Sequence, residues 1–176
     1  MSSDKAEKLI LGLKAKKVLF IGLGNPWRGD DGAGLFLVDL LEKKLPQKNF
    51  FYLKADENPE NFLGEIRRIM PEVVLLFDSA ALGKPGGEID VLAEGSISNG
   101  CISTHTYSLS IFTAYLKSAF KCDVYIIGIQ GETYGLSDGI LQISRNLRKR
   151  LAAFASKLQK QLELKPCAVK QREKKG

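Results

Sequence analysis

The feature that most constrains the fold is a set of three short, almost entirely apolar runs separated by amphipathic stretches. The runs are residues 17–22 (KVLFIG), 72–80 (EVVLLFDSA) and 122–130 (CDVYIIGIQ). Strands that are apolar on both faces are typical of a parallel sheet that helices cover on both sides. The chain has 176 residues, of which 44% are hydrophobic and 26% charged, and this is enough for one such domain with a proper core.

The segments between these runs predict helices and two further strands. Helical periodicity marks residues 4–15, 34–45, 58–70, 106–120 and 139–164. In the second of these, the residues expected to face inward are Leu35, Val38, Leu41 and Leu45. Residues 49–53 read as a strand, and residues 86–94 read as an edge strand. We therefore predict an α/β fold with three layers, a mainly parallel, twisted sheet of about five strands with helices on both faces.

The charge of the chain is unevenly distributed. The net charge is +6, but residues 141–176 hold 11 Lys/Arg and two Asp/Glu, whereas residues 1–140 hold 15 and 18. The excess positive charge therefore belongs to the last helix and the tail, which argues against nucleic acid as the partner of the folded body. We expect residues 1–164 to form a single α/β domain that includes a helical extension at 1–16, and residues 165–176 to form a basic, flexible tail.

The cysteines and the N-terminal segment exclude several classes of protein. The chain has three cysteines, Cys101, Cys122 and Cys167. Their odd number and the absence of a CxxC spacing argue against a disulfide framework and against a cysteine zinc site. The first 17 residues contain no apolar run long enough for a signal peptide or a membrane span. We expect a cytoplasmic protein that does not insert into membranes.

Candidate functional residues follow the ends of the apolar runs, where the site of such a fold lies. The first run leads into GLGNPWRGDDGAG with Asp30 and Asp31, the second ends at Asp78, and the only histidine, His105, precedes the helix at 106–120. Taken singly, each could be a helix cap or a surface side chain. Together, two carboxylates and an imidazole at one edge of a sheet favour a divalent cation, which would offset their repulsion. We predict that Asp31, Asp78 and His105 converge as metal ligands.

The glycine-rich turn leaves other functions open. Such a turn after a buried strand often binds phosphate, but the chain lacks both GxGxxG with its acidic partner and a Walker lysine. IGLGNP at residues 21–26 also resembles the turn after the first strand of peptidyl-tRNA hydrolases, which makes an esterase of that kind an alternative. The histidine and asparagine that carry hydrolysis in that family have no counterpart in WRGDDGAG.

A second resemblance covers about residues 17–155. The motifs GLGNPWRGDDGAG, LLFDSA, ISTHTYSLS and IGIQGE are similar, in the same order, to those of the hydrogenase maturation endopeptidases. The resemblance implies a peptidase that trims the C-terminus of a [NiFe] hydrogenase large-subunit precursor. It also implies that Asp31, Asp78 and His105 are the catalytic, metal-contacting side chains and that the precursor supplies the nickel, although other divalent metals could occupy the site. A non-catalytic nickel-binding maturation factor would use the same ligands.

One departure from the family pattern lies after the second predicted strand. Many relatives carry Asp-Gly-Gly there, where this chain has Lys54, Ala55 and Asp56 within LKADENPEN. A supporting role of that aspartate therefore cannot be assigned to Lys54.

The tail gives a first prediction. Removing residues 165–176, which follow no apolar period, should leave the cleavage product unchanged and the melting temperature nearly unchanged. Because diffuse positive charge accelerates association with an acidic partner, the truncated enzyme should bind its precursor more slowly at low salt only, as stopped-flow kinetics would show. Unfolding on truncation, or loss of cleavage at every salt concentration, would contradict this view of the tail.

Overall fold

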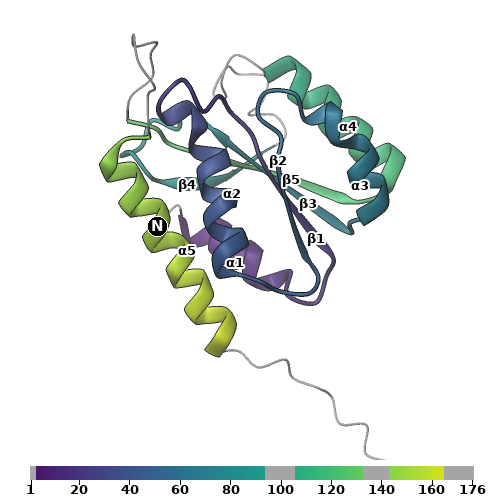
Figure 1. The fold of residues 1–176 in the computed structure, drawn as a ribbon, viewed down its shortest axis with the longest axis horizontal. Helices are drawn as coiled ribbons and strands as arrows, with labels where there is room; N and C mark the ends of the chain where they lie inside the picture. The colour runs from purple at the N-terminus through teal and green to yellow at the C-terminus, as the bar shows by residue number, and fades with distance from the viewer. Residues whose placement is uncertain (1–2, 94–105, 133–142, 165–176) are drawn as a thin grey trace, which may run out of the picture.

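The fold is built on a five-stranded sheet in the order β2-β1-β3-β5-β4. The structure is a computed structural model and describes residues 3–93, 106–132 and 143–164. The strands are β1 (Val18–Gly22), β2 (Phe50–Lys54), β3 (Val73–Ser79), β4 (Ile89–Leu92) and β5 (Asp123–Ile129). All neighbours pair in parallel except β4, which lies antiparallel to β5 at one edge. The predicted α/β architecture is confirmed, including the edge strand (Figure 1).

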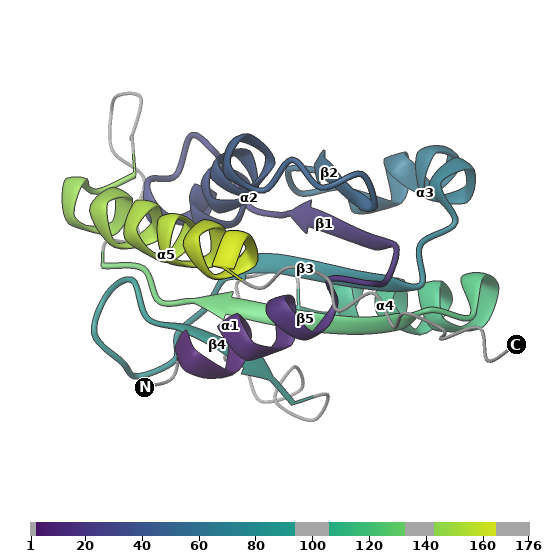
Figure 2. The ribbon, with the colours of Figure 1, turned by 90° about the horizontal axis from the view of Figure 1, so that it is seen from below.

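Helices cover both faces of this sheet. They are α1 (Ser3–Gly12), α2 (Ala33–Lys44), α3 (Leu63–Ile69), α4 (Thr106–Phe120) and α5 (Arg145–Leu164), with short 3₁₀ helices η1 (Asp30–Gly32) and η2 (Pro59–Phe62). Figures 1 and 2 show α1, α2 and α5 on one side of the sheet and α3 and α4 on the other. No helix within the described ranges is long and apolar enough to cross a membrane.

The strand β1 shows why its sequence is apolar at every position. Val18 and Phe20 belong to the core shared with α1, α2 and α5, whereas Leu19 and Ile21 belong to the core shared with α3 and α4. Because successive side chains of a strand point to opposite faces, two covered faces require a continuous apolar run. The inward positions predicted for α2 are confirmed, since Leu35, Val38, Leu41 and Leu45 are all at most 8% exposed.

Two predicted helices differ from the observed ones. The segment 58–70 forms η2 and then α3, with Pro59 at the start and with no capping hydrogen bond from the Asn58 side chain. The last helix begins only at Arg145. Ser144 precedes it, and its hydroxyl oxygen accepts the amide of Leu147 at 3.3 Å, which is the geometry of a serine cap. Of the residues predicted to start this helix, 139–142 lie outside the described ranges.

Close packing of α2 against the sheet places the loop before it at the carboxyl edge. A Cβ atom added to Gly34 would lie 2.1 Å from the carbonyl oxygen of Phe77 and 2.5 Å from that of Leu23. Only glycine therefore allows the first turn of α2 to rest on the ends of β1 and β3. This contact determines where η1, which directly precedes α2, can lie.

The substitution Gly34→Ala tests this contact. Both Gly34 and Gly64 are second residues of helices, but a Cβ at Gly64 would have no neighbour within 4 Å. We expect Gly64→Ala to stabilise the fold by up to about 1 kcal/mol, the difference in helix propensity. Gly34→Ala should instead lower the free energy of unfolding measured by urea denaturation, by about 1–3 kcal/mol as for other overpacked sites. Equal effects of the two substitutions would contradict the close approach.

Candidate functional site

Two predicted site residues, Asp31 and Asp78, meet at Ser79. The hydroxyl of Ser79 donates to Oδ1 of Asp31 at 2.9 Å, and the backbone amide of Ser79 donates to Oδ1 of Asp78 at 2.8 Å. Since one residue binds both carboxylates, their nearest oxygens are at most about 10 Å apart. Asp78 and Ser79 are buried, with 3% and 0% of their surface exposed, and Asp31 is half-buried.

The sheet and one glycine bring these side chains together. Strands β1 and β3 are adjacent and parallel, so their carboxyl ends lie at the same edge. Gly24, just beyond β1, has a φ of 119°, and a Cβ there would lie 1.9 Å from the backbone oxygen of Asp31. Glycine is thus required for the turn that returns η1 to the end of β3. The amide of Asn25 also donates to Oδ2 of Asp31 at 3.3 Å.

The two consecutive aspartates have different environments. Asp30 is fully buried, and its two carboxylate oxygens accept the backbone amides of Glu132 at 2.8 Å and Ser144 at 2.7 Å. Asp31 is partly exposed and faces the end of β3. Neither residue caps α2, whose N-cap is Gly32 without a side-chain capping bond. The geometry therefore favours Asp31 over Asp30 as the residue that can contact a substrate.

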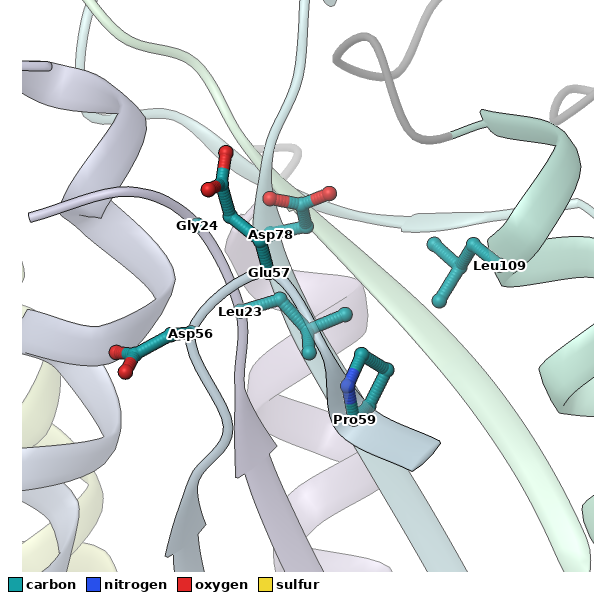
Figure 3. Close-up of a pocket in the computed structure, with 7 residues that line it drawn as sticks. All are labelled: Leu23, Gly24, Asp56, Glu57, Pro59, Asp78 and Leu109. Atoms are coloured by element: carbon teal, nitrogen blue, oxygen red, sulfur yellow. The ribbon is translucent and has the colours of Figure 1, made fainter. Parts of the chain in front are cut away.

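A small pocket of about 20 Å³ opens beside Asp78. It is lined by Leu23, Gly24, Asp56, Glu57, Pro59, Asp78 and Leu109. This volume holds about one water-sized molecule. In Figure 3 the carboxylates of Glu57 and Asp78 lie on the same side of the pocket, whereas that of Asp56 points away. Sequence reasoning missed Glu57 because it lies in a loop without periodicity.

Lys54 does not take part in this pocket. Its ammonium group forms an ion pair at 3.0 Å with Asp39 on α2, which also binds Lys43. The hydrogen bonds from Lys43 and Lys54 lower the pKa of the Asp39 carboxyl, and the bond to Asp39 raises the pKa of Lys54. The residue that departs from the family pattern therefore joins β2 to α2.

The motif IGIQGE, at residues 127–132, includes the end of β5 and binds the loop after β3 through Gln130. The side-chain oxygen of Gln130, directly after β5, accepts the backbone amide of Leu82 at 2.7 Å and that of Lys84 at 3.4 Å. Its amide nitrogen donates to the carbonyl of Gly131 at 2.9 Å. Gln130 thus connects the end of β5 to the segment that follows Ser79.

The third predicted ligand, His105, lies outside the described residues. Within the described ranges, no group of three histidine, cysteine, aspartate or glutamate side chains is gathered closely enough to hold a metal. The structure therefore brings Asp31 and Asp78 together, while the contribution of His105 stays a prediction.

Asp31 and Asp78 lie at the carboxyl edge of the sheet, which we call the acidic edge. The fold and this edge define an α/β protein whose site is built from strand ends and the loops that follow them. A family model described as HycI, hydrogenase maturation protease, matches residues 37–161. The chain belongs to the hydrogenase maturation protease family and is a peptidase. This membership decides against the peptidyl-tRNA hydrolase alternative. The matched range includes Asp78 and His105 but begins after Asp31.

Individual relatives agree with this assignment. A Methanocaldococcus jannaschii protein named as a hydrogenase maturation protease is 34% identical over 132 residues, which cover 70% of this chain and 78% of that protein. The hydrogenase 3 maturation protease of Escherichia coli is 30% identical over 114 residues, or 64% and 72% of the two chains. The crystal structure of the [NiFe] hydrogenase maturation protease HycI from Thermococcus kodakarensis superposes with a TM-score of 0.74 at 25% identity, covering 88% and 99%.

The ion pair of Lys54 gives a prediction for stability. Lys54→Ala should lower the free energy of unfolding by about 0.2–1 kcal/mol at pH 7, as for other exposed pairs, and leave peptidase activity unchanged. Because the pKa of Asp39 is lowered in the folded protein, the contribution is present above the ordinary carboxyl pKa of about 3.9 and is lost as the pH falls below it. Urea denaturation at several pH values, with Lys48→Ala as an exposed-lysine control, measures it. A loss of activity would contradict the assigned role of Lys54.

Proposed function

We propose that this peptidase removes the C-terminal extension of a nickel-loaded [NiFe] hydrogenase large-subunit precursor. Asp31, Asp78 and His105 recognise the nickel that the precursor carries. The observation that supports this proposal best is the meeting of the Asp31 and Asp78 carboxylates at Ser79, on the edge of the sheet where an α/β fold places its site.

The donor set suits this ion. Imidazole and carboxylate groups are ligands for borderline divalent metals, among which nickel binds nitrogen and oxygen donors well. Each carboxylate has about four lone-pair positions. The bonds from Ser79 and Asn25 occupy one position on each oxygen of Asp31, so capacity for a cation remains. Other divalent metals fit the same donors.

Two carboxylates bound to the same serine give the enzyme a means of selecting loaded precursor. Without a cation they repel each other, and burial of Asp78 increases the cost of its charge. A precursor that carries nickel supplies the missing positive charge, whereas an empty precursor supplies none. Ser79 holds both side chains in place before the substrate arrives, so little reorganisation is needed on binding.

The reaction is the hydrolysis of one peptide bond. Water adds to the scissile carbonyl carbon, the C–N bond breaks, and a proton passes to the amine that leaves. A divalent ion near the carbonyl oxygen can polarise the C=O bond of the scissile peptide. The role of the three side chains is to fix the precursor's metal, and with it the nearby peptide, against the carboxyl edge of the sheet.

Single substitutions test the proposed ligands. Asp31→Asn, Asp78→Asn and His105→Ala should each abolish the mass decrease of the nickel-loaded precursor, measured by mass spectrometry. His105→Ala should stay folded, because even the loss of a helix cap at this position would cost only about 0.5–2 kcal/mol of a typical total of 5–15 kcal/mol. Asp123→Asn is the matched control. Asp123 is an exposed aspartate at the start of β5, whereas the candidate site lies at the edge of the sheet where the parallel strands end.

Full cleavage by any of the three folded variants would remove that residue from the proposal. Loss of cleavage in Asp123→Asn would show that the assay responds to general damage. Circular dichroism on each purified variant separates these cases.

A further inference from the structure

The carboxylate of Asp30 joins three parts of the chain that are distant in sequence. It belongs to η1, and its oxygens accept the amide of Glu132, three residues after β5, and the amide of Ser144, directly before α5. The residue is fully buried, so water does not compete for these bonds. Ion-to-amide bonds of this kind are stronger than neutral ones.

Side chains reinforce the same junction. The hydroxyl of Ser144 donates to the carboxylate of Glu132 at 3.0 Å, and the side-chain amide of Asn146 donates to that carboxylate as well. Glu132 and Ser144 are therefore held together both by Asp30 and by each other. We call Asp30, Glu132, Ser144 and Asn146 the Asp30 junction.

The same short helix has a second attachment, through the residue next to Asp30. Asp31, next to Asp30, is bound by the hydroxyl of Ser79 at the end of β3. The helix η1 is thus fixed between β3 and the Asp30 junction. A shift at the junction would move the backbone that carries Asp31.

We propose that Asp30 is a positioning residue of the peptidase, which fixes η1 through the amides of Glu132 and Ser144 so that Asp31 faces Ser79 and the substrate. The inference rests on the proposed role of Asp31. Asp30 itself does not contact the substrate, since its carboxylate is buried in the junction. The two neighbouring aspartates therefore have different roles: Asp30 positions the helix η1, and Asp31 contacts the substrate.

A carboxylate is needed because two amide donors face one side chain. Asparagine of the same size offers one acceptor oxygen, and its NH₂ group would face the second amide, which would then have no acceptor on residue 30. Asp30→Asn should therefore release the amide of Glu132 or Ser144 and loosen η1. Displacement of a catalytic group by about 1 Å reduces rates by up to about a hundredfold.

The test measures steady-state cleavage of nickel-loaded large-subunit precursor together with amide hydrogen exchange. For Asp30→Asn we expect kcat to fall about tenfold to a hundredfold with KM little changed. The amides of Glu132 and Ser144 should exchange slowly in the natural protein and faster in the variant. Asp123→Asn is the matched control, because it makes the same chemical change at an exposed aspartate outside the junction, and it should keep kcat.

Three results would overturn the proposal. They are an unchanged kcat for folded Asp30→Asn, a change confined to KM, and amides of Glu132 and Ser144 that exchange in the natural protein as fast as unprotected amides. The last measurement needs no variant, so it decides the question even if Asp30→Asn does not fold. Failure of the proposed function would give a different result. In that case Asp31→Asn would keep full activity, while the amides of Glu132 and Ser144 would still be protected from exchange.

Discussion

The site depends on one residue, Ser79, which binds two carboxylates through different groups. Its hydroxyl contacts Asp31 and its amide contacts Asp78. This is possible only because β1 and β3 are neighbouring parallel strands and because Gly24 and Gly34 allow the loop and α2 to approach them closely. Closely packed backbone, rather than a flexible loop, thus carries Asp31 to the end of β3. For the proposed recognition of nickel on the precursor, this arrangement would hold the two carboxylates in place in advance.

Much of the fold follows from the sequence, because a strand covered on both faces must be apolar throughout. That rule identified β1, β3 and β5, and with them the edge at which Asp31 and Asp78 meet. It could not separate the aspartates of the pair, since neighbours in a sequence share the same local pattern. Their difference depends on the amides of Glu132 and Ser144, more than 100 residues away.

Loop residues were harder to assign for a related reason. The loop after β2 has no periodicity, so the sequence did not indicate that Glu57 lines the pocket beside Asp78. It also did not indicate that Lys54, the last residue of β2, binds Asp39. The start of α5 was also placed too early. Its apolar period extends back to Ile143, but Asp30 binds the amide of Ser144 and the Ser144 hydroxyl caps the helix. The cytoplasmic location and the basic tail stay predictions from sequence.

The central claim is that the acidic edge selects a precursor by its nickel. The most direct measurement incubates the natural enzyme with large-subunit precursor prepared with and without nickel and follows the mass of the precursor over time. The account predicts that only the nickel-loaded precursor loses its C-terminal extension, and that adding nickel to the empty precursor restores cleavage. Equal cleavage of both forms in the presence of a chelator that removes free metal would contradict it, because the carboxylates would then have no cation to recognise.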